Sequence, residues 1–197
     1  MRHLNERNIK MEGKLVRLEE ISPKYFEKVI EWRNNPENNK FLNQPFKLTI
    51  ELEKQWYEEK YLNDKTQGLF IVIDKENEAP FATIGYTDYD ENKKICIIGR
   101  LLVGELQYRG SDKWREGTYV FNEYIYNILN VNVAYAHIVC ENIASIKWHK
   151  KWYYKENKFE VQFPDELFVN GMKQKEFYRT KEEYNSLKLK SFCDRGI

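Results

Sequence analysis

The residues best suited to bind a charged ligand lie in one stretch, residues 95–129, where an apolar run is followed by a glycine-bearing turn and then by an amphipathic segment. The run from Ile95 to Val103 predicts a strand, and the pattern after Asp112 predicts a helix. A helix that begins just beyond a strand presents free backbone N–H groups, which attract anions and phosphate above all. The stretch therefore predicts an enzyme that holds a phosphate-bearing cofactor by its backbone.

Length and charge narrow the class of protein. The chain has 197 residues and a net charge of +1, so it has no electrostatic footprint for non-specific binding to nucleic acid. We expect one domain over residues 1–197, with a leading segment at 1–12 and a tail at 191–197. No apolar run approaches the roughly 20 residues that a membrane span needs, and the first residues are polar. The expected protein is cytoplasmic and binds no membrane.

Cysteine and histidine are too few and too scattered to predict a metal centre. Cys96, Cys140 and Cys193 are widely spaced, which fits neither a disulfide framework nor a zinc site. The strand patterns around Cys96 and Cys140 predict buried structural thiols rather than nucleophiles. We therefore expect no metal cofactor.

The elements that position the glycine-bearing turn follow from hydrophobic periodicity and from turn residues. The predicted order is a strand at 14–19, helices at 22–34 and 49–62, strands at 69–73, 81–89 and 95–103, a helix at 112–129, a strand at 133–140, a helix at 142–152, a hairpin of 159–169 with 173–178, and a short last helix. Asn170-Gly171 predicts the hairpin turn, and Thr180 with Glu183 fits a capping box. Because strand and helix do not alternate throughout, the order predicts a mixed α/β (α+β) fold with a largely antiparallel sheet flanked by helices.

This order of elements and four short motifs resemble the GCN5-related N-acetyltransferases (GNATs), in particular the branch that includes ribosomal-protein N-terminal and amino-sugar acetyltransferases. The resemblance covers about residues 13–184. Its motifs are the opening strand Gly13-Lys14-Leu15-Val16-Arg17-Leu18, the W-R-N segment Glu31-Trp32-Arg33-Asn34-Asn35-Pro36-Glu37, the turn Gln107-Tyr108-Arg109-Gly110-Ser111-Asp112 at the place of the acetyl-CoA motif Q/R-x-x-G-x-G/A, and the helix start Asn142-Ile143-Ala144-Ser145 with Lys151 downstream.

The resemblance implies that acetyl-CoA lies between two central strands that splay apart, the one ending at Val103 and the one at 133–139. Backbone groups of Leu101, Leu102 and Val103 would pair with the pantetheine arm, and the N–H groups from Arg109 to Lys113 would bind the pyrophosphate. The implied cofactor-binding residues are Leu101, Leu102, Val103, Gln107, Arg109, Gly110, Ser111, Asp112, Lys113, Asn142 and Ser145.

Four features depart from the family pattern. Asp112 stands where the acetyl-CoA motif has glycine or alanine, and Ile97 stands where many members carry a glutamate, so no general base is assigned. Tyr153-Tyr154 replaces the usual Gly-Phe. His149 matches the position of a tyrosine general acid, which makes it the candidate general acid or proton shuttle for the thiolate leaving group. Tyr153 and Tyr154 are the other candidate catalytic residues.

The candidate acceptor-binding residues lie at element ends. Trp32, Arg33 and Asn34 end the first helix, where they could line an acceptor pocket or serve as core and ion-pair residues. Tyr86 and Asp88 lie near the end of a strand, where packing and turn chemistry are the alternatives to acceptor contact.

The expected activity is acetyl-CoA-dependent transfer of an acetyl group to a primary amine by direct attack, with a backbone N–H near Leu102 or Val103 stabilising the oxyanion. The expected acceptor is a small molecule such as an amino sugar, and a protein N-terminus or a polyamine are alternatives. A non-catalytic binding or scaffold protein with the same fold is the rival of another class. A nucleotide hydrolase is disfavoured because the turn lacks a Gly-Lys-Ser/Thr ending. We expect a monomer or homodimer.

Overall fold

The computed structural model describes residues 8–42 and 44–193. The strands are β1 (Lys10–Glu12), β2 (Val16–Glu20), β3 (Gly68–Asp74), β4 (Pro80–Asp90), β5 (Ile95–Val103), β6 (Val133–Val139), β7 (Lys155–Glu156), β8 (Phe168–Val169) and β9 (Met172–Thr180). The α-helices are α1 (Phe26–Asn34), α2 (Pro36–Asn39), α3 (Ile50–Trp56), α4 (Asp112–Glu123), α5 (Ile143–Lys151) and α6 (Lys181–Cys193). Single 3-10 or π turns lie at Pro23–Tyr25, Tyr57–Tyr61, Leu106–Tyr108, Tyr124–Ile128 and Pro164–Leu167.

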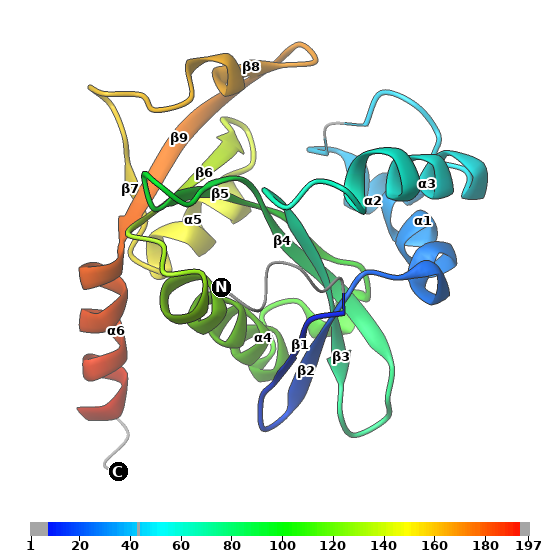
Figure 1. Cartoon of the computed structure of the whole chain (residues 1–197), viewed down its shortest axis with the longest axis horizontal. Coiled ribbons are helices and arrows are strands. Elements are labelled where there is room, and N and C mark those ends of the chain that lie inside the picture. Colours follow the sequence, from blue (N-terminus) through cyan, green and yellow to red (C-terminus); the bar gives the residue numbers. More distant parts are fainter. Residues whose placement is uncertain (1–7, 43, 194–197) are drawn as a thin grey trace.

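The strands form one mixed sheet in the order β1-β2-β3-β4-β5-β6-β9-β7, with β8 paired to β9 outside that order. Every neighbouring pair is antiparallel except β5 and β6, which run parallel. Figure 1 shows α1, α2 and α3 grouped on one side of the sheet, α4 and α5 on the other, and α6 continuing from the end of β9. The predicted mixed fold is confirmed. None of the helices in the described part of the chain is long and apolar enough to cross a membrane.

A hydrophobic core lies on each face of the sheet. Successive side chains of β3 point to opposite faces, so β3 contributes residues to both cores. Phe70 and Val72 pack into the core that α4 covers. Leu69 and Ile71 pack into the core made with α1 and with the end of α3. The sheet is therefore buried on both faces at its centre, and each face can present a different set of side chains to a ligand.

Two local predictions from the sequence are confirmed, a hairpin turn and a helix capping box. Asn170 and Gly171 both have positive φ, 47° and 77°, as a tight hairpin turn requires. Thr180 Oγ1 accepts from the N–H of Glu183, whose carboxylate accepts from the N–H of Thr180, so the capping box forms in both directions.

Three predicted elements are corrected. The leading segment contains a strand, β1, because it pairs with β2 along the sheet edge. Pro36 ends α1 but also begins α2, since Asn35 accepts from the N–H of Glu37 and caps it. The first strand of the last hairpin is only Phe168–Val169, and most of 159–167 is loop and 3-10 turn.

One carboxylate fastens α4, which begins at the glycine-bearing turn, to the edge of the sheet. Glu116 accepts hydrogen bonds from the backbone N–H groups of Lys14, Leu15 and Val16, at 3.0, 2.6 and 3.0 Å. These residues lie about a hundred positions earlier in the chain, so the anchoring depends on the tertiary fold.

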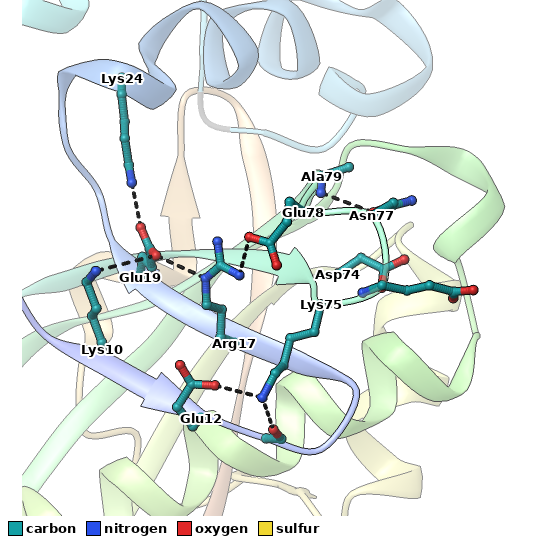
Figure 2. Close-up of polar contacts among 12 residues, drawn as sticks. Lys10, Glu12, Arg17, Glu19, Lys24, Asp74, Lys75, Asn77, Glu78 and Ala79 are labelled. Atoms are coloured by element: carbon teal, nitrogen blue, oxygen red, sulfur yellow. Dashed lines mark hydrogen bonds and ion pairs between the residues drawn. The ribbon is translucent and has the colours of Figure 1, made fainter.

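A second carboxylate holds the outer strands together (Figure 2). Glu19 is 6% exposed and receives bonds from Arg17 at 3.0 Å and from Lys24 at 2.7 Å, and Lys10 lies 3.7 Å away. Arg17 also pairs with Glu78 on the turn after β3. The network joins β1, β2 and the β3–β4 turn.

Replacing Glu19 with glutamine is expected to destabilise the fold by about 1–2 kcal/mol at neutral pH. Burial alone would raise the pKa of Glu19, but its bonds to Lys24, Tyr25 and Arg17 outweigh burial and lower the pKa to about 2. A carboxylate with a depressed folded-state pKa stabilises the fold above pH 4.5, its ordinary value, and this contribution is lost as the pH falls toward 2. Urea unfolding at about pH 7 and at about pH 2.5 measures the difference.

Glu78→Gln is the matched control, because Glu78 pairs with the same arginine but its side chain is 64% exposed. Its expected cost is below about 0.5 kcal/mol. An equal loss for Glu19→Gln at both pH values would contradict the electrostatic explanation.

Candidate active site

The centre of the sheet opens between β5 and β6. Parallel pairing joins only Ile95–Ile97 to Val133–Tyr135. Beyond Ile97, β5 stays paired with β4 on one side and β6 with β9, so among the described residues these two strands do not pair further with each other. The predicted splayed strand pair is confirmed. Its consequence is that one backbone edge of β5, through Leu101, Leu102 and Val103, is left for a ligand.

A bulge in β5 lies beside this opening. Gly99 pairs with Gly85 and Leu102 with Thr83, so Arg100 and Leu101 together oppose one residue of β4. Arg100 adopts a φ of 57°, and its carbonyl oxygen accepts from Thr83 Oγ1 at 2.7 Å. The bulge sends neighbouring side chains to opposite faces: Leu101 lines a pocket beside α4 and α5, whereas the Arg100 guanidinium lies 5.4 Å from the ring centre of Trp56 at the end of α3.

The turn that follows β5 presents unused N–H groups. Ser111 caps α4 by accepting from Trp114, and the N–H groups of Arg109 and Ser111 donate within the turn to Leu106 and Tyr108. In the described structure, no protein group accepts a hydrogen bond from the backbone N–H of Gly110, Asp112 or Lys113. This corrects the expected set of five donors to these three. Gly110 has a φ of 73°, which a residue with a side chain rarely adopts.

Two charged side chains near the turn are directed away from it. Lys113 Nζ lies 2.7 Å from both Asp74 and Glu76, so its charge is shared with the β3–β4 turn. The carboxylate of Asp112 is 81% exposed and pairs with Arg115 at 2.6 Å. Asp112 therefore differs from the family glycine in charge without covering the N–H groups. Because the Lys113 ammonium is already paired, Lys113 offers the turn its backbone N–H rather than its side chain.

The turn rests on side chains from the sheet and from the first helices. The Tyr108 ring stacks on Phe81 with ring centres 4.1 Å apart, and its hydroxyl donates to Asp74 at 2.7 Å. The Arg109 guanidinium donates to Asn38 Oδ1 at 2.7 Å. Gln107 is exposed to solvent. The turn is held from both sides before any ligand binds, which lowers the entropic cost of binding.

The three residues of the W-R-N segment have different roles: two support the fold and one is left for the candidate site. Trp32 is 2% exposed, and its Nε1 donates to Glu105 at 3.0 Å. Its indole lies so close to Gly104 that a Cβ there would approach within 2.1 Å of the ring. Asn34 holds the N–H and the carbonyl of Leu48. Trp32 and Asn34 are therefore corrected from acceptor-binding to structural residues, and within the described part of the chain Arg33 is the one of the three whose side chain has no such contact.

The two predicted acceptor residues on β4 lie in different surroundings. Tyr86 is 2% exposed and packs against Tyr89 and Tyr124 in the core, so it is corrected to a packing residue. Asp88 is exposed at a second irregularity of β4, with a φ of 53°. Cys96 is buried as predicted, whereas Cys140 is half-buried.

A pocket lies between α4, α5 and the bulged part of β5, and we call it the α4–α5 pocket. His149 and Tyr154 line it together with Leu101, Thr118 and Trp148. Trp148 also stacks on Trp114 of α4, with ring centres 6.0 Å apart, which joins the two helices. The complete lining is Ile84, Ile98, Leu101, Thr118, Phe121, Asn122, Trp148, His149, Trp152 and Tyr154.

His149 is a neutral ring with one nitrogen committed. Its Nδ1 lies 2.9 Å from the carbonyl oxygen of Ser145, and because a carbonyl only accepts, Nδ1 carries the proton. Burial lowers the pKa of His149 to about 4, and the charge of Arg179 acts in the same direction. A neutral ring has no imidazolium proton to give at rest, so of the two predicted roles, general acid and proton shuttle, the second fits this geometry better. Nε2 is the nitrogen left to accept a proton, which fits the other expectation, a proton shuttle.

The remaining predicted residues of α5 and its end have separate positions. Asn142 caps α5 by accepting from the N–H of Ser145, so its amide N–H groups are the part left for a ligand. Tyr154 is 5% exposed, lies edge-on to His149 and has the Arg179 guanidinium 4.6 Å above its ring. Burial raises the pKa of its hydroxyl. Tyr153 is 39% exposed and has a φ of 65°.

Sequence reasoning missed the residues that act across the fold. Asp74, Asn38 and Glu105 support the turn, yet each is an ordinary polar residue at an element end. Arg100 offered a signal, because it is the one charged residue in the apolar run Ile95–Val103. A charge within a strand predicted to be buried on both faces indicates a functional position.

Comparison with known proteins agrees with this geometry. A family model described as "Acetyltransferase (GNAT) domain" matches residues 16–152. A search of curated proteins found no match.

Solved structures with the same fold include three acetyltransferases. A GCN5-related N-acetyltransferase from Brucella melitensis has a TM-score of 0.76 at 20% identity, over 93% of this chain and 83% of that chain. A spermidine N-acetyltransferase from Vibrio cholerae in complex with CoA and spermine has a TM-score of 0.73 at 16% identity, over 87% and 99%. FdhC, a nucleotide-linked sugar GNAT, has a TM-score of 0.73 at 16% identity, over 93% and 97%.

Proposed function

The chain belongs to the GNAT acetyltransferase family, and from this premise we propose that it transfers the acetyl group of acetyl-CoA to the primary amine of a small molecule. One observation carries the proposal. The open edge of β5 beyond Ile97 leads directly to three unused N–H groups at the start of α4. An extended arm that ends in a pyrophosphate matches this arrangement, since the strand edge offers peptide groups and the helix start offers anion-binding donors.

The residues present fit acetyl-CoA in two places. The N–H groups of Gly110, Asp112 and Lys113 would bind the pyrophosphate, and the backbone of Leu101–Val103 would pair with the pantetheine arm. The Asn142 amide would donate from the start of α5, on the other side of the opening. Acetyl-CoA would supply an acetyl group already activated as a thioester.

The chain's own groups would then stabilise charge and move one proton. A backbone N–H of Leu102 or Val103 would donate to the thioester oxygen as negative charge develops on it. The attacking amine would release its proton to water in the opening between β5 and β6, and His149, neutral and with Nε2 unprotonated, would take up that proton from the side of the α4–α5 pocket. A buried imidazolium is a strong acid, so His149 would pass this proton on to the leaving thiolate. Direct attack needs no nucleophilic side chain.

The acceptor would reach the reacting carbon from the face that α1 and α3 cover. Leu101 and the α4–α5 pocket occupy the other face of β5. A small-molecule acceptor is supported by two fold relatives, whose names give spermidine and a nucleotide-linked sugar.

Binding of CoA tests the proposal, and Gly110→Ala is the variant to use. Isothermal titration of the wild-type chain with CoA is expected to give a Kd of about 1 μM–1 mM. A side chain at a φ of 73° strains the turn and shifts its N–H groups, so Gly110→Ala is expected to weaken CoA binding by about tenfold.

Gly171→Ala is the matched control. Gly171 has a φ of 77° in the distant β8–β9 hairpin, and a Cβ at either glycine meets nothing within 4 Å. Both variants should lose similar stability, but only Gly110→Ala should lose CoA affinity. No heat and no thermal stabilisation of the wild type by millimolar acetyl-CoA would overturn the proposal in favour of a non-catalytic protein of this fold.

A further inference from the structure

Three charged side chains come together on the α1–α3 face of β5, at the bulge. Glu53 of α3 is 1% exposed, and Arg33 of α1 and Arg100 of β5 are half-buried. Glu53 interacts electrostatically with both arginines, yet within the described part of the chain no ion pair joins it to either of them. We call these three residues the Arg33–Arg100 subsite.

The subsite contains polar atoms that the fold leaves unsatisfied. Glu53 Oε1 and Arg100 Nη1 are buried and have no hydrogen-bond partner in the described structure. Burying a polar group without a partner destabilises the fold, so native folds retain few such groups. Such atoms mark a place where a further polar group belongs.

Arg100 is anchored at its other end. Its Nη2 donates to Gln67 Oε1, and the Gln67 amide in turn donates to Asp64 and to the carbonyl of Lys60. The Trp56 ring lies 5.4 Å from the guanidinium carbon. Because one edge of the guanidinium is held, the other edge is oriented in advance and loses little entropy on binding an anion.

The charges of the subsite do not cancel. Two guanidinium groups face one carboxylate, which leaves one positive charge in a partly desolvated place. Burial lowers the pKa of both arginines and raises the pKa of Glu53, so all three charged forms are destabilised as the fold stands. Asp64 and Asp88 also act on Arg100, but Asp64 already accepts from Thr66 and Gln67, and Asp88 is exposed to water.

We propose that the acceptor amine carries an anionic group, a carboxylate or a phosphate, that Arg33 and Arg100 bind. The inference rests on the proposed function, since it names the class of acceptor for that same site. The bulge places Arg100 next to Leu101, which lies at the opening between β5 and β6, so an anion on Arg100 holds the rest of a small acceptor beside the reacting carbon. The planar guanidinium fork binds carboxylate and phosphate through two parallel hydrogen bonds.

The positive charge of the subsite also disfavours one class of acceptor, the polyamines. A polyamine carries several positive charges, and like charges brought together at a site cost affinity. The inference therefore favours an amino sugar that bears a phosphate, or an amine that bears a carboxylate, over a polyamine.

Matched pairs of amines test the proposal. Glucosamine and glucosamine 6-phosphate differ in a phosphate, serinamide and serine differ in a carboxylate, and spermidine is the polycation. Thiol release from acetyl-CoA gives kcat/KM for each. In at least one pair the anionic member is expected to be favoured by about tenfold or more, and Arg100→Gln is expected to lower its kcat/KM by about 10- to 100-fold without affecting the neutral member.

Arg17→Gln is the control, because it removes a half-buried arginine that pairs with Glu19 and Glu78 at the far edge of the sheet. Arg33→Gln replaces Arg100→Gln if the latter does not fold.

Equal rates within both pairs, or spermidine as the preferred acceptor, would overturn the inference and leave the proposed function intact. If no amine reacts, the anionic amines are titrated into the CoA complex. Absence of binding in that titration also overturns the inference. Loss of CoA binding itself would overturn the proposed function instead.

Discussion

Replacing Arg179 with leucine is expected to lower the free energy of unfolding by about 3–5 kcal/mol. Arg179 on β9 is 0% exposed, and its guanidinium donates to Tyr126, to the carbonyl of Trp152 and to Asn122. It also lies 4.6–5.1 Å from the ring centres of Tyr126, Tyr154 and Tyr184. Leucine would leave the carbonyl and the amide oxygen buried without donors, and it would remove three cation–π contacts. Denaturant unfolding at neutral pH measures the loss.

Arg179→Lys separates charge from geometry. A lysine keeps the positive charge but cannot supply the fork that reaches three acceptors, so it is expected to recover less than half of the lost stability. Arg115→Leu is the control for removing an arginine, since the Arg115 side chain is 48% exposed and pairs with the exposed Asp112, and its cost should be about 1 kcal/mol or less. Wild-type stability for Arg179→Leu would mean that burying the charge costs as much as its contacts return.

His149→Asn is expected to lower kcat by about 100-fold while leaving the Kd for acetyl-CoA within about twofold of wild type. The asparagine amide can still donate to the carbonyl of Ser145, as Nδ1 does, but it has no atom at the position of Nε2. The variant therefore keeps the contact that orients the residue and removes the proton acceptor. Steady-state thiol release gives kcat, and calorimetry gives the affinity.

Two further measurements make the role of His149 specific. Because its pKa is lowered to about 4, wild-type kcat should show no inflection from this residue between pH 5.5 and 7.5. His149→Gln places an amide near the position of Nε2 but no titratable nitrogen, so it should be as slow as His149→Asn. An unchanged kcat in both variants would move proton transfer to a tyrosine or to water.

What the sequence determined by itself is local. Caps, turns and hydrophobic period depend on residues within a few positions of one another, so the capping box at Thr180 and the Asn170-Gly171 turn follow from the sequence directly. The order of elements then predicted the mixed sheet and its splayed central pair, which the structure confirms.

Only the tertiary structure decided which side chains act together at the candidate site. Trp32, Arg33 and Asn34 are neighbours in sequence, yet packing puts the indole under Gly104, the amide on Leu48, and the guanidinium beside Glu53 and Arg100. Lys113 is neutralised by Asp74 from 39 positions away, and Glu53 meets Arg100 only because α3 lies over the bulge of β5.

The physical reason is that burial, charge pairing and pKa are properties of the surroundings of a side chain, not of its neighbours along the chain. His149 has an ordinary sequence context between lysines, and only the fold buries it beside Arg179 and makes it neutral. Local chemistry thus determined where the anion-binding turn lies, and long-range packing determined which groups around it are free to bind and react.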